Sequence, residues 1–275
     1  MDETANMDLS IGVLSWRSHE TLRKTLNSYR QGRLTDCAHE SVVFFNEISG
    51  ADRLFLAGFN ADGWRCAGNE SNLGIFGGTD ALARLLGGKY LLMLQNDCPL
   101  VADVEATRRY LESAVALLDS GAADVVRCRS RAFPGQGFAD KKKYDRYYGD
   151  GWAAALRRLC RPWKARRMIG RAPYAVPDAD RRFPNYITCA GSFLLVDSEV
   201  INFTDQPFLI SRNLLLELLE WGKAHPRGRQ PVGRHALEVC LNTGWWRQQH
   251  FKVAVGEGIF THDRVGGGFR KTSCT

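Results

Sequence analysis

Residues 90–99, Tyr-Leu-Leu-Met-Leu-Gln-Asn-Asp-Cys-Pro, decide the fold. Five apolar or aromatic residues run directly into three polar ones. This pattern predicts a strand buried on both faces that ends in Gln95, Asn96 and Asp97. Ligands of open parallel sheets bind outside the carboxyl ends of the strands, so Asp97 is placed to hold a metal ion that carries a nucleotide diphosphate. Alternatively, Asp97 only begins the turn into Cys98-Pro99, because Asp near Pro is common in turns.

Strand and helix patterns alternate through the first half of the chain. Apolar segments predict strands at residues 10–16, 41–48, 64–67 and 123–128, in addition to the one that begins at residue 90. Amphipathic segments between them predict helices at about residues 18–29, 51–59, 79–86 and 102–118. This alternation implies right-handed crossovers and an α/β fold with a mainly parallel, Rossmann-like sheet. No G-x-G-x-x-G follows the first strand, which argues against a dinucleotide dehydrogenase or a typical methyltransferase.

The middle of the chain, residues 131–186, is basic and rich in aromatic residues. Residues 141–182 contain thirteen Lys and Arg against four Asp, a net charge of +9, whereas the whole chain has +7. One helical stripe carries Trp152, Leu156, Leu159 and Trp163, and Pro162 must end or kink that helix. Four interpretations stay open: an acceptor site for a phosphorylated or acidic substrate, a helix on an anionic membrane surface, a nucleic-acid patch, or a solvated, partly ordered insertion.

The last third returns to the strand and helix pattern. We expect a strand at residues 188–196 entered through Gly191, helices at about residues 211–223 and 235–249, and a last strand at residues 251–255. A loop at residues 225–233 separates the two helices, and a glycine-rich, basic tail follows the last strand.

Composition indicates an ordinary soluble globular chain. Of its residues, 44% are hydrophobic and 24% are charged. The length of 275 residues is enough for one large α/β domain or two small ones. No apolar run approaches the roughly 20 residues of a membrane span, and residues 1–8 lack the layout of a signal peptide. The eight cysteines are scattered without a C-x-x-C pair, which argues against a structural zinc site. A reducing, cytoplasmic location is expected.

The chain resembles the GT-A glycosyltransferases, in particular those of family 2. Four stretches carry the resemblance: the strand at Ile11, the strand end Phe44-Phe45-Asn46-Glu47, the block from Asn72-Leu73-Gly74 through Asp80 to Asp97, and the pair Glu238 and His262. The third stretch is similar to the family's N-x-G block followed by a helix and the D-x-D metal motif. Gln95 replaces the first Asp of that motif, whereas the second is present as Asp97.

The resemblance implies a single catalytic domain over residues 1–275. Its parts would be a nucleotide-sugar-binding half at residues 9–130, the basic insertion at residues 131–186, and an acceptor-side half with the metal-ligand loop at residues 187–275. Asp97 and His262 would hold a divalent metal, Mn²⁺ or Mg²⁺. Gly256 and Gly258 predict a mobile, closely approached loop before His262. Alternatively, His262 is a loop histidine bonded to the backbone.

Further roles follow from the same resemblance. Glu238 would be the general base that takes the proton of the acceptor hydroxyl, with Glu217 and Glu220 as competitors. Alternatively, Glu238 is a surface residue of an amphipathic helix. The donor nucleotide sugar would be bound by Ser15, Trp16, Glu47, Asn72, Asp80, Gln95 and Asn96. Glu47 is alternatively an acid at a helix N-terminus, and Asp80 alternatively caps the helix after it.

The predicted function is therefore metal-dependent, inverting glycosyl transfer from a nucleotide diphosphate sugar, first a UDP-sugar, to a glycan or lipid-linked hydroxyl. Residues 141–182 would add a peripheral contact with an anionic membrane, and nucleic acid is not the expected partner. One alternative is a non-catalytic α/β protein that binds nucleic acid or membrane through residues 141–182. A nucleotidyltransferase is a third candidate, disfavoured because no glycine-rich, basic phosphate loop follows the first strand.

Overall fold

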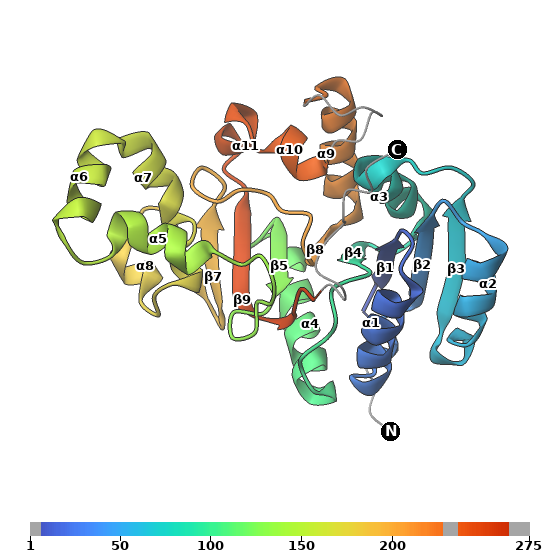
Figure 1. Ribbon diagram of the computed structural model, residues 1–275. Helices are drawn as coiled ribbons and strands as arrows, with labels where there is room; N and C mark the ends of the chain where they lie inside the picture. Colours follow the sequence, from blue (N-terminus) through green and yellow to red (C-terminus); the bar gives the residue numbers. More distant parts are fainter. Residues whose placement is uncertain (1–6, 228–235, 264–275) are drawn as a thin grey trace.

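A nine-stranded mixed sheet with helices on both faces forms the protein (Figure 1). The computed structural model describes residues 7–227 and 236–263. The strand order is β3-β2-β1-β4-β8-β5-β9-β7-β6. The strands are β1 (Leu9–Ser15), β2 (Glu40–Asn46), β3 (Trp64–Asn69), β4 (Tyr90–Gln95), β5 (Val125–Arg129), β6 (Ile187–Ala190), β7 (Phe193–Asp197), β8 (Phe208–Ser211) and β9 (Lys252–Phe260).

Most strands run in one direction, as predicted. β1 pairs in parallel with β2 and β4, β2 with β3, and β5 with β9. β8 is antiparallel to both of its neighbours, β4 and β5, and β7 is antiparallel to β9 and β6. Because β8 lies between β4 and β5, both of these point the same way, and so does β9. The carboxyl ends of β1, β2, β4 and β9 therefore lie at one edge of the sheet.

Helices cover the two faces of the sheet in separate groups. The first group contains α1 (His19–Gln31), α2 (Gly50–Ala57) and α4 (Val104–Asp119). The second contains α3 (Gly74–Leu85), α5 (Asp140–Tyr148), α7 (Pro162–Ile169), α8 (Ala179–Arg182), α9 (Arg212–Ala224), α10 (Leu237–Leu241) and α11 (Gly244–Gln248). α6 (Trp152–Cys160) packs outside α5 and α7, and short 3₁₀ turns occur at Leu34–Cys37, Asn60–Asp62 and Ala172–Tyr174.

Strand alternation explains why the sheet is buried on both faces. Val42 and Phe44 of β2 belong to one apolar cluster, whereas Val43 and Phe45 belong to the other. Successive side chains of a strand point to opposite faces, so a continuous apolar run supplies both layers.

Two predicted elements of the second half differ from the structure, and one strand was not predicted. Residues 188–196 form a hairpin, β6 and β7, rather than one strand, because Gly191 takes a positive φ of 58° in a two-residue loop. β8 was not expected. The predicted helix at residues 235–249, whose first residue lies outside the described residues, is two short helices that break at Asn242 and Thr243.

The glycines near the end of the chain belong to a strand. β9 continues through Gly256 and Gly258 to Phe260, so the predicted mobile loop is wrong. The predicted close approach is confirmed: Gly258 has φ 69°, and a Cβ there would collide with the carbonyl oxygen of Arg129. The β5–β9 register shifts beside this point, as expected for a β-bulge.

The basic segment is ordered, so the interpretation as a partly ordered insertion is wrong. Tyr144, Ile169 and Ala179 from its helices are buried in the main apolar cluster. Pro162 ends the first predicted helix and starts the next, where its missing N–H costs nothing. Among the described residues, no helix combines the length and apolarity needed to cross a membrane.

Candidate active site

The edge of the sheet at the carboxyl ends of β4 and β9 brings two distant residues together. β4 ends at Gln95, and Asp97 follows it within a buried tip where its own exposure is 4%. β9 ends at Phe260, and His262 follows it at the same edge. The order of the strands thus places an acidic and an imidazole side chain beside each other although they are far apart in the chain.

Backbone hydrogen bonds fix the two segments to each other. The N–H of Thr261 donates to the carbonyl of Pro99, and the N–H of Asp263 donates to that of Asp97, both at 2.9 Å. His262 Nε2 consequently lies 3.2 Å from Oδ2 of Asp97. A scaffold of main-chain hydrogen bonds holds this pair, so its spacing does not depend on mobile side chains alone.

The pair fits a divalent cation. The Nδ1 atom of His262 is 3.2 Å from the carbonyl oxygen of Gln136. The alternative interpretation, a histidine bonded to the backbone, therefore holds for this ring nitrogen only. The other, Nε2, is buried and has no hydrogen bond to a described residue. A ligating histidine characteristically donates its second N–H to such an acceptor. In an octahedral shell with bonds of about 2.1 Å, neighbouring ligand atoms are about 3 Å apart, which matches the observed spacing.

A second cluster lies where β1 and β2 end. The indole Nε1 of Trp16 donates to Oε2 of Glu47 at 3.0 Å, and the guanidinium of Arg17 donates to the same oxygen at 3.3 Å. Arg17 also lies over the Trp16 ring, 4.9 Å from its centre. The amide nitrogen of Asn96 is 3.5 Å from Oγ of Ser15, the last residue of β1. Four residues predicted to bind the nucleotide sugar thus lie together: Ser15, Trp16, Glu47 and Asn96.

The backbone of this cluster adopts an uncommon conformation. Arg17, Ser18 and Glu47 have φ angles of 53°, 66° and 88°. Non-glycine residues with positive φ cost about 1–3 kcal/mol each and concentrate at functional sites. The alternative role for Glu47, an acid in the first turn of a helix, is wrong, because Asp52 occupies that position in a capping box with Ser49.

Asn72 lies beside the end of β2 and shapes the entry into α3. Its Oδ1 accepts hydrogen bonds from the amide of Asn46 at 3.2 Å and from the N–H of Gly74 at 2.8 Å. Asn46 in turn accepts from the N–H of Leu73 at 2.8 Å. The asparagines therefore fix the loop between the end of β2 and α3.

Asp80 is not a helix cap. It lies in the middle of α3, whose N-cap is Leu73, and its carboxylate is 3.0 Å from both the Arg84 guanidinium and the Lys223 ammonium. These cations hold Asp80 on the side of α3 that faces α9. The structure does not join it to Ser15, Trp16 or Glu47 by any described contact.

Gln95 connects the end of β4, beside the Asp97–His262 pair, to a pair of carboxyl groups. Its side-chain amide donates to the carbonyl of Asp205 at 3.0 Å. Glu238, the second residue of α10, has its N–H 3.5 Å from Oδ2 of Asp205. Burial, reinforced by the negative charge of Glu238, raises the pKa of Asp205 to about 7. Sequence reasoning missed Asp205, because Thr-Asp-Gln-Pro reads as an ordinary turn.

The competitors of Glu238 lie elsewhere. Glu217 and Glu220 belong to α9, and Glu220 is an exposed partner of Arg84 and Lys223. Glu238 is half-buried rather than a fully exposed surface residue, and it lines a cavity beside α5 and α7. The position favours Glu238 over the residues of α9.

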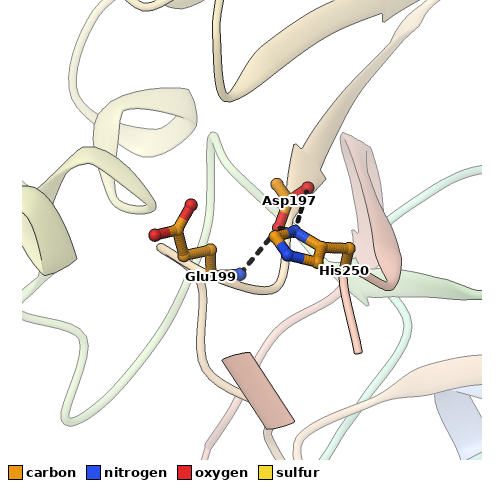
Figure 2. A group of neighbouring side chains, drawn as sticks. All are labelled: Asp197, Glu199 and His250. Carbon is orange, nitrogen blue, oxygen red and sulfur yellow. Dashed lines mark hydrogen bonds and ion pairs between the residues drawn. The ribbon is translucent and has the colours of Figure 1, made fainter. Parts of the chain in front are cut away.

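A second group with metal-ligand chemistry lies at the opposite edge of the sheet. Asp197, Glu199 and His250 gather where β7 ends and β9 begins (Figure 2). Oδ2 of Asp197, however, is 2.9 Å from the ammonium of Lys252, and Glu199 pairs with Arg166 at 2.5 Å. Two cations already neutralise the two carboxylates, so the group is a structural ion-pair network that ties β7 to β9 and α7.

Solved structures share this architecture. A fragment of S. aureus TarS, residues 1–349, matches at a TM-score of 0.52 and 13% identity, over 94% of this chain and 60% of that one. The mannosyltransferase PcManGT from Pyrobaculum calidifontis, solved with GDP-Man and Mn²⁺, matches at 0.54 and 14%, over 98% and 60%. GalNAc-T7, solved with UDP, GalNAc and Mn²⁺, matches at 0.59 and 12%, over 97% and 45%.

The likeness is one of fold. The identities of 12–14% and the nearly complete coverage of this chain confirm the predicted α/β fold of the GT-A type. The chain spans 37–60% of the length of the first solved proteins that it matches. No protein-family model and no curated protein sequence matches the chain.

Proposed function

We propose that the protein is a metal-dependent glycosyltransferase that moves a sugar from a nucleotide diphosphate sugar, first a UDP-sugar, to a hydroxyl of a glycan or lipid-linked acceptor with inversion. One observation carries this proposal: the buried Asp97–His262 pair at the carboxyl edge of a GT-A sheet. The three stretches 9–130, 131–186 and 187–275 then serve the donor, the acceptor surface and the acceptor-side catalytic groups.

Asp97 and His262 would hold Mn²⁺ or Mg²⁺. The cation, when bound, neutralises the negative charge that grows on the diphosphate leaving group. The carbonyl of Gln136 keeps the imidazole in the tautomer whose Nε2 lone pair is available. Gln95, which stands where the family has a further Asp, positions the Asp205 loop instead.

The nucleotide would lie over the ends of β1 and β2. Glu47 would accept the N3–H of uracil, and Trp16 would present its ring to the base or ribose. Ser15 and Asn96 supply a hydroxyl and an amide at the same edge. Asn72 supports the loop beside them, and Asp80 would meet the sugar only if the donor displaced its Arg84 or Lys223 partner.

Glu238 would take the proton of the acceptor hydroxyl as it attacks. The adjacent Asp205 carboxyl, with its pKa near neutrality, would stay protonated in part at pH 7 and limit charge repulsion beside Glu238. Glu238→Gln should lower kcat by about 10²- to 10⁴-fold, whereas Asp205→Asn, which preserves a neutral side chain, should lower it far less. The reverse order of the two losses would assign the base to Asp205.

A thermal-shift panel of nucleotides and nucleotide sugars, with and without Mn²⁺, tests the function. A ligand at roughly a hundredfold excess over its Kd stabilises the folded protein by about 2.7 kcal/mol, so the true donor should raise Tm clearly. We expect the largest rise with one diphosphate nucleotide and Mn²⁺ together, and no such rise in Asp97→Ala. A flat panel in the wild-type protein would refute the proposal.

The exposed stripe of α6 and α7 supports a peripheral contact with an anionic membrane from the cytoplasmic side. Trp152, Leu159 and Trp163 are 79%, 80% and 78% exposed. Arg158 directly precedes Leu159 and Lys164 directly follows Trp163, and this combination suits an interfacial helix pair.

Co-sedimentation with phosphatidylserine vesicles tests this contact. Binding should fall sharply in Trp152→Ser/Trp163→Ser, with Trp221→Ser on α9 as a control outside the stripe. Failure of the wild-type protein to sediment at low salt would end the membrane proposal. A salt-sensitive shift of nucleic acid without nucleotide-sugar binding would favour a non-catalytic binding protein instead.

A further inference from the structure

A cavity of about 420 Å³ opens beside Glu238. β5 forms one wall, α5 and α7 form another, and the segment at residues 200–207 closes the third. Five cationic residues line it, from three separate parts of the chain: Arg127, Arg129, Lys143, Arg167 and Arg171. Two carboxylates, Asp140 and Glu238, share the lining, so the described wall has a surplus of positive charge.

Part of this charge is already matched within the protein. Arg171 forms an ion pair with Asp140. The guanidinium of Arg129 donates to the carbonyl oxygens of Pro134 and Gln136, at 2.6 and 2.7 Å, which satisfies its hydrogen bonds without cancelling its charge.

The remaining cations have donors to spare. Arg127 donates to the carbonyl of Asn202, but its buried Nε has no hydrogen-bond partner among the described residues. Lys143 and Arg167 lie exposed at the rim, and neither forms an ion pair within the part of the chain that the structure describes. Unmatched donors from three elements thus converge on one cavity.

Concentrating these charges costs free energy in the absence of a ligand. Burial lowers the pKa of Arg129, and burial together with the neighbouring charge of Arg127 lowers that of Arg171. Positive side chains that repel one another in a cavity are stabilised when an anion binds between them. Arginines in particular offer paired N–H groups to phosphate oxygens.

We propose that this cavity binds a phosphate group of the acceptor, so that the enzyme glycosylates a phosphorylated substrate whose hydroxyl then reaches Glu238. This inference rests on the proposed glycosyl transfer and adds the acceptor class to it. A phosphate supplies up to two negative charges and several acceptor oxygens, which suits converging donors better than one carboxylate does.

The phosphate has two chemical sources, a soluble phosphorylated glycan or a lipid phosphate. A second cavity shares Lys143, Met168 and Arg171 with the first and continues between α5, α6 and α7 past Arg157 and Lys164. It leads from the catalytic side toward the helices whose tryptophans are exposed, so either source has a basic path to Glu238.

Direct binding of glucose 1-phosphate tests the proposal by calorimetry at about 150 mM salt, without metal or nucleotide. We expect saturable binding that weakens about tenfold or more in Lys143→Met/Arg167→Met, whose exposed side chains are not needed for folding. Lys142→Met, an adjacent exposed lysine outside this cavity, should bind as the wild type does. A parallel arm uses phosphatidic acid vesicles against pure phosphatidylcholine vesicles, and tighter binding in one arm identifies the source.

Two results would overturn the proposal: no saturable binding in either arm, or an equal loss in Lys142→Met. Asp97→Ala should retain the phosphate binding, and UDP with Mn²⁺ should not compete for it. If the wild-type protein bound phosphate but no nucleotide sugar, the proposed transferase function would be refuted instead. The two failures are therefore distinguishable.

Discussion

Two carboxylate and imidazole clusters occupy opposite edges of the same sheet, and they differ in what surrounds them. In the group of Asp197, Glu199 and His250, Lys252 and Arg166 neutralise both acids, and the histidine side chain is 61% exposed. In the Asp97–His262 pair the histidine side chain is only 12% exposed, and its Nε2 has no hydrogen bond to a described residue. Ligand-type residues alone therefore do not define a metal site. Cations that already neutralise the carboxylates, as Lys252 and Arg166 do here, argue against one.

The largest expected effect separates the two acids. Asp97→Ala should lower turnover of the nucleotide sugar by about 10³-fold, because it removes charge stabilisation at the leaving group. Asp197→Ala, the matched acid at the other edge, should leave metal-dependent turnover of the folded enzyme nearly unchanged. Release of the nucleoside diphosphate, measured with and without Mn²⁺, checks both. If Asp97→Ala kept the metal dependence of the wild type and Asp197→Ala lost it, Asp197 rather than Asp97 would be the metal ligand.

The two histidines give the next contrast. His262→Ala should weaken Mn²⁺ binding in the presence of the nucleotide by about tenfold to hundredfold, whereas His250→Ala should not change it. Titration of free Mn²⁺ by electron paramagnetic resonance measures the affinity directly. Equal losses in both variants would mean that neither histidine is a specific ligand.

A smaller effect than either of these concerns stability at the ion-pair network. Burial alone would raise the pKa of Asp197, but hydrogen bonds from the Glu199 N–H, Lys252 and His250 outweigh it and hold the pKa below its ordinary value. Asp197→Asn should cost about 1–3 kcal/mol of unfolding free energy at pH 7. A lowered pKa stabilises the folded state fully at pH values above the ordinary pKa of Asp, and this stabilisation is lost as the pH falls below it. The difference from wild type should therefore shrink as pH falls below about 4.

Asp205 should behave in the opposite sense. Its pKa of about 7 lies above the ordinary value, so the folded state loses stability as pH rises from about 4 to 7. Asp205→Asn cannot ionise and should therefore have a higher Tm than the wild type at pH 8, with the difference vanishing near pH 4. Thermal denaturation across this range measures it, and an unchanged gap at all pH values would contradict the assignment.

The first half of the fold was predictable because its strands are continuous apolar runs with polar ends. The stretch at residues 90–97 indicated both the buried strand and the place of Asp97, and the resemblance to GT-A glycosyltransferases implied that His262 would meet it. The second half was less predictable. β8 has only four residues, and a four-residue apolar segment beside a helix has no distinctive period.

The site was predictable only where single residues carry the chemistry. Asp205 gains its raised pKa from burial and from Glu238, neither of which shows in a turn sequence. The basic cavity draws on residues from 127 to 242, so its composition becomes visible only when the helices of the basic segment pack beside β5.

The hydrogen bonds that join the segment after β9 to the tip of β4 also set an order of events during synthesis. Asp97 is made early, but its partner follows β9, so the ribosome must complete almost all of the described chain before the two can meet. A nascent or prematurely stopped chain can present the proposed nucleotide-binding residues at the ends of β1 and β2 without the imidazole. Incomplete products are therefore expected to lack tight cation capture, which separates them from finished ones.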